Sequence, residues 1–232
     1  MRAMILAAGR GVRLSPLTDT KPKPLIRVGE KCLIEYQIEA LHKAGIQDIV
    51  INTGWLGQQL IDHLGSGSRY KVNLEYSIEP ESGLETGGGI YQALPLLGNK
   101  PFIVVNADIF HQFDLEGLGH DLDADTLAHL VLVENPSFNP GGDFCMLENK
   151  VFLKDPALPD SHDHADKKSY TFSGIGVYRP ELFIELRPGK FPLAPLLKAA
   201  IRRARVTGEF TAARWFDAGT ESRIAEIERF IR

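Results

Sequence analysis

The residues best suited to chemistry near the N-terminus are two glycines and two cations that follow a short apolar run. Gly9 and Gly11 come directly after residues 3–8, and Arg13 and Lys23 belong to the same loop. Glycine lets backbone N–H groups surround a phosphate without interference from a Cβ atom. Guanidinium and ammonium groups add positive charge for phosphate oxygens. The loop therefore predicts a polyphosphate site at which charge developing during attack on phosphorus is neutralised.

Two aspartates farther along the chain have the chemistry of magnesium ligands. Asp108 follows the apolar run 102–106, and Asp217 precedes a glycine-threonine pair. Mg²⁺ is held in proteins by few carboxylates and completes its shell with water and phosphate oxygens. It would polarise the phosphorus and screen the approach of a second anion. Taken alone, either aspartate is also compatible with a helix cap or a turn, whereas the pair together with the N-terminal loop favours a metal site.

The elements that must position these residues alternate between strand and helix in the first half of the chain. Apolar runs without alternation are typical of strands buried on both faces. We expect strands over residues 3–8, 46–52, 72–77 and 102–106, and helices over 33–44, 55–64 and 87–97. This order predicts an α/β fold, a three-layer, Rossmann-like, mixed but mainly parallel sheet with helices on both faces. Ligands of such sheets lie beyond the carboxyl ends of the strands, where Gly9, Glu85 and Asp108 fall.

The second half of the chain is less regular, and no break in composition divides it from the first. We expect strands over 126–133 and 170–178, a hairpin over 143–153, and helices over 192–205 and 221–231. Residues 156–168 are polar and rich in Asp, His and Pro, which is typical of an exposed, mobile loop. A single domain over residues 1–232 is therefore the expected organisation.

Composition excludes several classes of partner. The net charge of −4 argues against nucleic-acid binding, which needs a basic surface. No apolar stretch approaches the roughly 18 residues that would cross a membrane, and the N-terminal run is too short for a signal peptide. Cys32 and Cys145 have no CxxC spacing and are interpreted as reduced thiols, not as a disulfide or zinc site. The seven histidines form no metal-ligand pattern. We therefore expect a cytoplasmic protein, monomeric or a small homo-oligomer.

The segment LAAGRGVRLSPLTDTKPKPL resembles the signature of the sugar-1-phosphate nucleotidyltransferase family, in which GxGxR and PLT are followed by PK-x-L. Further resembling blocks follow in family order over nearly the whole chain, at residues 79–80, 85–89, 106–108 and 216–220. The resemblance implies Mg²⁺-dependent transfer of a nucleotidyl group from a nucleoside triphosphate to a sugar 1-phosphate, giving a nucleotide-sugar and pyrophosphate. Because the sugar phosphate is already a nucleophile, catalysis would rest on positioning and charge stabilisation.

The family resemblance also implies a role for each matching residue. Arg13 should bind the phosphates that leave as pyrophosphate, and Lys23 should steady the α-phosphate and the sugar phosphate. Asp108 and Asp217 should hold Mg²⁺. The nucleotide should be bound by Leu6, Ala7, Ala8, Gly9, Gly11, Arg13, Glu79, Gly87 and Gly88. The nucleotide-binding half would span about residues 1–110 and the sugar-binding half about residues 111–232.

Within the family, the blocks LIEYQIEAL, LETGGGI, NPGGDF and TFSGIGVY resemble the members that use UTP and N-acetylmuramate 1-phosphate. This implies that Asp143, Ser173 and Gly174 form the sugar-side wall. Two positions depart from the common family pattern. Ala107 stands before Asp108 where many members have glycine, and residues 153–156 replace a Glu-Lys-Pro sugar-binding block.

Several alternatives stay open from the sequence. No residue by itself selects uridine, so a mannose 1-phosphate guanylyltransferase or a phosphocholine cytidylyltransferase is possible within the same class. A non-catalytic nucleotide-sugar sensor is the rival outside it, although a pure binder has no need for two metal-binding acids. A Rossmann oxidoreductase is disfavoured because Leu14 replaces the third glycine and Asn52 stands where an acid is expected. Trp55 and Trp215 are interpreted as packing residues.

Overall fold

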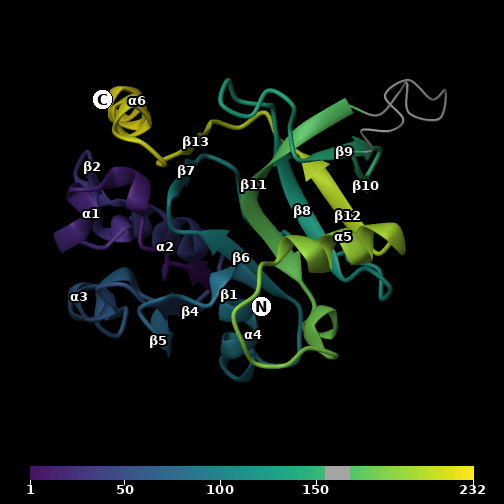
Figure 1. Cartoon of the computed structure of the whole chain (residues 1–232), viewed down its shortest axis with the longest axis horizontal. Coiled ribbons are helices and arrows are strands. Elements are labelled where there is room, and N and C mark those ends of the chain that lie inside the picture. Colours follow the sequence, from purple (N-terminus) through teal and green to yellow (C-terminus); the bar gives the residue numbers. More distant parts are fainter. Residues whose placement is uncertain (155–167) are drawn as a thin grey trace.

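The computed structural model describes residues 1–154 and 168–232 and is built around one mixed β-sheet with strand order β5-β4-β1-β6-β11-β8-β12-β10-β9 (Figure 1). Its strands are β1 (Arg2–Leu6), β4 (Asp48–Thr53), β5 (Asn73–Ile78), β6 (Phe102–Asn106), β8 (Ala128–Val133), β9 (Phe144–Leu147), β10 (Lys150–Leu153), β11 (Lys168–Tyr178) and β12 (Val206–Phe210). The loop expected over 156–168 lies outside the described residues, except for Lys168, which begins β11.

Helices cover both faces of this sheet. The described helices are α1 (Leu17–Thr20), α2 (Leu33–Lys43), α3 (Gly57–Leu64), α4 (Glu85–Leu97), α5 (Ala194–Arg202) and α6 (Glu221–Ile231), of which α2 to α5 cover the sheet. Apolar residues of α2 and α3 pack on one face, and those of α4 and α5 pack on the other. The predicted three-layer α/β fold with a mixed sheet is confirmed. Among the described residues, no helix combines the length and the hydrophobicity that crossing a membrane requires.

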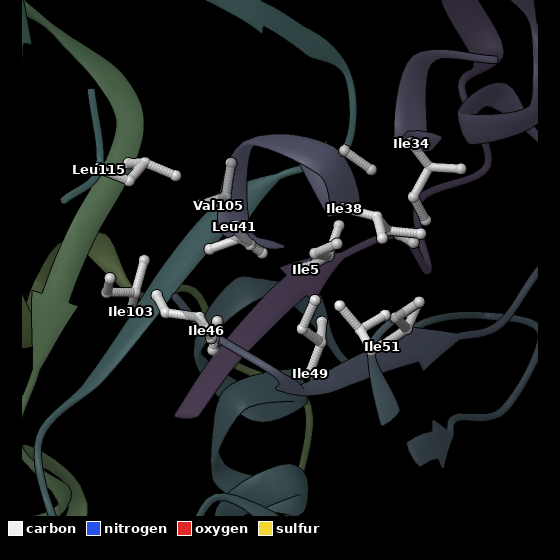
Figure 2. Packing of buried hydrophobic residues seen from close by; sticks show 14 of the residues in the cluster. Ile5, Ile34, Ile38, Leu41, Ile46, Ile49, Ile51, Ile103, Val105 and Leu115 are labelled. Atoms are coloured by element: carbon white, nitrogen blue, oxygen red, sulfur yellow. The ribbon is translucent and has the colours of Figure 1, made fainter. Parts of the chain in front are cut away.

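Residues of β1 explain why its apolar run shows no alternation. Ala3 and Ile5 point toward α2 and α3, Met4 points toward α4, and all three are fully buried. Figure 2 shows Ile5 packed between Ile38 of α2 and the neighbouring strands. Burial on both faces stabilises this strand as a support, because a large apolar side chain such as Met4 or Ile5 contributes about 1.5–3 kcal/mol when it is removed from water.

Parallel pairing is concentrated in the first half of the chain. β5, β4, β1 and β6 are parallel neighbours, so their carboxyl ends meet at one edge. β11 then runs antiparallel to both β6 and β8, and β12 returns parallel to β8. The strand order and the antiparallel insertion of β11 were not predicted, because apolar runs fix the existence of strands and not their neighbours.

Two short ladders stand beside the main sheet, β2 (Arg27–Val28) with β3 (Lys31–Cys32), and β7 (Ile109–His111) with β13 (Trp215–Asp217). A third apolar cluster places α6 against the β7–β13 ladder through Phe110, Ala218 and Ile224. The segment that carries Asp217 is thereby fixed beside the end of β6. These pairings were missed from the sequence because strands of two or three residues carry no readable periodicity.

Candidate active site

Two adjoining cavities lie at the carboxyl ends of the parallel strands. The first has a volume of about 230 Å³ and the second about 250 Å³, and Gly9, Lys23 and Asp108 line both. Among the residues predicted to bind the nucleotide, the first cavity is lined by Leu6, Ala7, Ala8, Gly9 and Glu79. The second is lined by Gly9, Gly11 and Arg13, together with Gly219. The structure therefore brings most of the predicted site together where such sheets bind ligands.

An ion pair stands at the wall that the two cavities share. Lys23 lies in a short helical turn between Pro22 and Pro24, and its ammonium group donates a hydrogen bond to Asp108 Oδ2. Lys23 is buried, whereas the Asp108 side chain is partly exposed. A buried ammonium group needs an anionic partner, and the phosphate of a substrate could replace the Asp108 carboxylate in that role.

The glycine loop before this pair depends on Gly11. Its φ of +66° lies in the left-handed region, and a Cβ there would lie 3.1 Å from atoms of Lys23 and Thr18. Thr18 Oγ1 donates to the Gly11 carbonyl over 2.9 Å, and Trp55 Nε1 donates to the Thr18 carbonyl over 3.0 Å. These bonds fix the loop, while the exposed side chain of Arg13 makes no hydrogen bond with the described residues. Arg13 is thus available to an anion in the second cavity.

Asn52 is a site residue that sequence reasoning missed. Its Oδ1 accepts the Ala7 amide over 2.7 Å, and its Nδ2 donates to Glu79 Oε1 over 2.6 Å. Leu84 N donates to Glu79 Oε2 over 2.8 Å. A Cβ at Gly89 would overlap Glu79 Oε1 and approach Asn52, so helix α4 needs glycine there. The signal available in the sequence was the place of Asn52 at the carboxyl end of a buried strand.

Gly87 and Gly88 are placed differently from the other predicted nucleotide residues. Both are buried in α4 and do not line either cavity. Gly88 N donates to the Phe191 carbonyl over 3.0 Å, so these glycines allow close packing against the segment before α5. Glu85 and Thr86, the two residues directly before them, line the first cavity instead. Contact of Gly87 and Gly88 with a nucleotide stays a prediction.

The two predicted metal ligands are brought side by side, Asp108 in the turn between β6 and β7 and Asp217 on the strand paired with β7. Asp217 ends β13, and Ala218 N donates to the Asp108 carbonyl over 2.8 Å. Asp217 Oδ1 accepts Gly219 N and Arg223 Nη1, each over 2.6 Å. Asp217 Oδ2 makes no hydrogen bond with any residue that the structure describes. Two carboxylates at one edge, with a free oxygen on Asp217, form a donor set that suits Mg²⁺.

The residues predicted to line the sugar side make hydrogen bonds or close contacts with other parts of the fold. Asp143 accepts Asn139 Nδ2 over 3.0 Å and Phe172 N over 2.8 Å, which ties the loop before β9 to β11. Ser173 is buried, and its hydroxyl donates to the Val131 carbonyl over 2.7 Å. Gly174 has a φ of +83° at an irregularity of β11 and lies against Asn106. None of the three lines the cavities described here, and their part in a sugar-binding wall stays a prediction.

A third cavity, of about 400 Å³, lies between β13, the loop before Asp143 and α6. Trp215 and Asp217 line it, together with Phe138 and Arg223. Trp215 Nε1 donates to the Ser173 carbonyl over 2.8 Å, which joins this cavity to the sugar-side strand. Trp215 thus packs as predicted and also borders a cavity. Phe138 and Arg223 were missed because no motif links a loop to a helix more than eighty residues away.

One cluster away from the cavities concerns the cysteines. Both are free thiols, and Cys32 lies with Glu35 and His63 so that one ligand atom of each falls within 4.8 Å of the others. No spacing of cysteine, histidine and acidic residues in the sequence predicted this cluster. Glu35 already accepts Cys32 N over 2.6 Å, Tyr70 OH over 2.5 Å and Arg69 Nη2 over 3.2 Å. These bonds account for the grouping without an ion.

Comparison with known proteins supports the same class. Residues 2–140 match the family model described as nucleotidyl transferase. An N-acetylmuramate α-1-phosphate uridylyltransferase of Neisseria meningitidis serogroup B is 47% identical, with 98% of this chain and 97% of the relative covered. The protein of that name from Caulobacter vibrioides is 31% identical over 97% of both chains. A mannose-1-phosphate guanyltransferase of Hypocrea jecorina is 33% identical over 81% of this chain and 52% of its own length.

Solved structures agree on the fold. A Bacillus anthracis protein described as a glucose-1-phosphate thymidylyltransferase superposes with a TM-score of 0.85 at 23% identity, covering 100% of this chain and 96% of that one. A UDP-glucose pyrophosphorylase with bound UDP-glucose gives 0.76 at 20% identity over 99% and 97%. The matching family model and the relatives of 47% and 31% identity confirm the family predicted from the N-terminal loop and the two aspartates. The chain belongs to the sugar-1-phosphate nucleotidyltransferase family.

Proposed function

We propose that this enzyme transfers a uridylyl group from UTP to N-acetylmuramate 1-phosphate and releases pyrophosphate. The reaction is supported by one observation above all, the Lys23–Asp108 pair at the wall shared by two cavities. A nucleoside in one cavity and phosphates in the other would meet at this wall. The substrates are supported by the Neisseria relative, whose likeness extends over nearly the whole of both chains.

The bond changes follow from this arrangement. A phosphate oxygen of the sugar 1-phosphate attacks the α-phosphorus of UTP, a new P–O bond forms, and the bond to the β-phosphate oxygen breaks. Pyrophosphate leaves with the negative charge of that oxygen. Lys23 would exchange Asp108 for the α-phosphate and the incoming phosphate, and Arg13 would hold the leaving phosphates in the second cavity. Positioning of two anions by two cations accounts for the catalysis without a covalent intermediate.

Asp108 and Asp217 would hold Mg²⁺ in this reaction. Bound there, the ion would draw charge from the α-phosphate and reduce the repulsion between the two anionic substrates. The free Oδ2 of Asp217 and the partly exposed carboxylate of Asp108 are the oxygens available for it. Arg223 and Gly219 N hold the other oxygen of Asp217 and so orient the carboxylate, as partners of metal ligands commonly do.

Base and ribose would occupy the first cavity, against the β1 carboxyl end and Glu79. The Asn52–Glu79 pair is satisfied internally, so its role would be to fix the shape of the base pocket. Asp143, Ser173 and Gly174 would shape the sugar-binding half from about residue 111, opposite the nucleotide-binding half before it. Because two halves share one continuous sheet, both substrates would be presented on a single rigid support.

The setting of the reaction belongs to the same proposal. The named substrate is a constituent of bacterial cell wall, so the enzyme would serve reuse of wall fragments. Free thiols at Cys32 and Cys145 are compatible with the reducing cytoplasm. A monomer or a small homo-oligomer remains the expected assembly.

The test is pyrophosphate release by the purified chain with Mg²⁺, over a grid of nucleoside triphosphates against sugar 1-phosphates and phosphocholine. Turnover with UTP and N-acetylmuramate 1-phosphate, lost in Lys23→Ala and Asp108→Asn and kept in the exposed control Lys198→Ala, is the expected result. Turnover with GTP and mannose 1-phosphate, or with CTP and phosphocholine, would replace the substrates and keep the mechanism. Nucleotide binding without turnover of any pair would make the chain a sensor.

A further inference from the structure

Arg223 lines the third cavity, and the proposed reaction involves only the part of its guanidinium group that holds Asp217. Arg223 of α6 is only about one-sixth exposed, and its guanidinium carbon lies 4.0 Å from the centre of the Phe138 ring. Its Nη1 donates to Asp217 Oδ1 over 2.6 Å, and its Nε donates to Thr220 Oγ1 over 3.3 Å. The remaining nitrogen, Nη2, makes no hydrogen bond with the described part of the chain. A stacked and anchored guanidinium with one free nitrogen is preorganised for an anion.

The position of this guanidinium relates it to the reacting groups. A Cβ built on Gly219 would lie 3.2 Å from Arg223 Nη2, and Gly219 lines the cavity that holds Arg13 and Lys23. The guanidinium therefore lies directly behind the wall of that cavity. On its other side, Trp215 reaches the sugar-side strand through the Ser173 carbonyl. The third cavity thus lies between the proposed metal ligands and the proposed sugar wall.

The cavity also offers apolar faces of the kind that sugars contact. The rings of Phe138 and Trp215 have centroids 6.5 Å apart and planes inclined by 35°. Phe138 is about half exposed although it is a large apolar residue. Exposed aromatic rings beside polar groups are typical of binding surfaces. A ligand with apolar C–H edges and one anionic group fits this combination.

We propose that Arg223 binds a carboxylate of the acceptor and thereby selects an acidic sugar 1-phosphate over neutral ones. This inference rests on the proposed function. N-acetylmuramate carries a lactyl ether that ends in a carboxylate, which N-acetylglucosamine lacks. Nη2 donates to that carboxylate, while Nη1 stays on Asp217. The acceptor is recognised by the residue that orients one of the metal-binding acids, so binding the correct sugar and ordering Asp217 support each other.

A second charged residue of the same cavity, Glu226, allows the role of Arg223 to be tested independently. It lines the same cavity one helical turn after Arg223 and is exposed. Its carboxylate repels an anion in the cavity, so the acceptor carboxylate lies at the guanidinium end. Removing the negative charge of Glu226 should strengthen binding of an acidic acceptor, whereas removing the positive charge of Arg223 should weaken it. Opposite signs at two neighbouring positions are not expected from damage to the fold.

The experiment compares two acceptors of the same shape, N-acetylmuramate 1-phosphate and its analogue in which the lactyl carboxylate is a carboxamide. Values of kcat/KM are measured for the wild type, Arg223→Gln, Glu226→Gln and the exposed helix control Arg229→Gln. We expect the wild type and Arg229→Gln to prefer the carboxylate roughly 10- to 100-fold, the range of a charged hydrogen bond. In Arg223→Gln the preference should fall to near one. Glu226→Gln should lower KM for the carboxylate only.

Every other outcome contradicts either the carboxylate subsite or the proposed function. If Arg223→Gln lowers kcat/KM equally for both acceptors and the preference persists, Arg223 acts only through Asp217 and the carboxylate subsite is wrong. A wild type that uses both acceptors equally also overturns it. Failure of the wild type to use either acceptor, with turnover of another sugar phosphate, instead contradicts the proposed function. Affinity for UTP, measured by calorimetry, should stay within about twofold of the wild type in Glu226→Gln and Arg229→Gln.

Discussion

Asn52 Nδ2 donates a hydrogen bond to the Glu79 carboxylate, and Asn52 Oδ1 accepts one from the Ala7 N–H. The Asn52 side chain therefore joins the carboxyl ends of β1, β4 and β5. Asn52 and Glu79 are both buried. A buried carboxylate that loses its donor keeps its desolvation cost without the compensating bond. The floor of the first cavity therefore depends on a hydrogen bond that no motif in the sequence predicts.

Replacing Asn52 with leucine should destabilise the protein and weaken nucleotide binding together. The change leaves Glu79 and the Ala7 N–H without their partner, at a cost of about 2–4 kcal/mol. Urea denaturation should show a lower midpoint with an unchanged slope, and the Kd for UTP should rise. Asn52→Asp, which keeps the acceptor but brings two carboxylates together, should be at least as damaging. Normal stability in Asn52→Leu would contradict a structural role for this pair.

Gly89→Ala should disturb the same pair from the helix side. The new Cβ overlaps Glu79 Oε1, so α4 must shift away from β5 although alanine favours helix. We expect a loss of about 1–3 kcal/mol of stability and a higher KM for UTP, with a smaller change in KM for the sugar phosphate. An alanine variant more stable than wild type, as helix propensity alone predicts, would show that the close approach is not real.

Lys23→Ala should lower kcat far more than it weakens UTP binding. Removing one preorganised cation from the reacting phosphates costs roughly 10²- to 10³-fold in kcat, by analogy with loss of one oxyanion donor. Asp108 loses its partner as well, so the folded state should be checked by thermal unfolding. The rate of pyrophosphate release at saturating UTP gives kcat, and its dependence on UTP concentration gives KM. A variant with wild-type kcat would remove Lys23 from the mechanism.

Asp217→Asn should raise the metal requirement of the enzyme. The amide is a weaker Mg²⁺ ligand than the carboxylate, and it also loses the charge that holds Arg223. We expect the Mg²⁺ concentration for half-maximal rate to rise at least several-fold, with partial rescue of the maximal rate at high Mg²⁺. Direct Mn²⁺ binding, followed by electron paramagnetic resonance, should weaken in parallel. Unchanged Mn²⁺ affinity would exclude Asp217 as a ligand.

His111 makes folding stability depend on pH. Burial lowers the pKa of His111 from its ordinary value of 6.5 to about 4 in the folded protein. Its Nε2 donates a hydrogen bond to Gln37 Oε1 over 3.1 Å. Because the unfolded chain binds this proton first, stability is full above pH 6.5 and falls as pH drops toward 4, by roughly 2–3 kcal/mol.

The pH effect is tested by urea denaturation of wild type and His111→Gln between pH 4 and pH 7.5. The wild type should lose stability on acidification with a slope that the variant lacks in this window. Glutamine keeps a polar group near Gln37 without a titratable proton. Parallel curves for the two proteins would assign the acid sensitivity to other groups.

Family, layers and the main loop were predictable because their signals are local. The uninterrupted apolar runs and the GxGxR loop lie within short stretches, and parallel strands bring their ends together by topology alone. Arg223 and Phe138 could not be found this way. Their meeting depends on how α6 docks on the β7–β13 ladder, which in turn depends on the packing of Phe110, Ala218 and Ile224.

The glycines of α4 illustrate the same limit. Their spacing resembles a family block, and the resemblance implied contact with the nucleotide for Gly87 and Gly88. In the structure they pack against the segment before α5, and Gly89 faces Glu79. A sequence shows that a backbone must approach something closely, but not which neighbour it approaches.

The most direct test of the central claim follows the oxygen atoms of the acceptor. N-acetylmuramate 1-phosphate labelled with ¹⁸O in its non-bridging phosphate oxygens is incubated with UTP, Mg²⁺ and the enzyme, and products are analysed by mass spectrometry. Attack of the sugar phosphate on the α-phosphorus predicts a UDP-sugar that keeps every labelled oxygen and a pyrophosphate that contains none. Label in the pyrophosphate, or no UDP-sugar at all, would contradict the account.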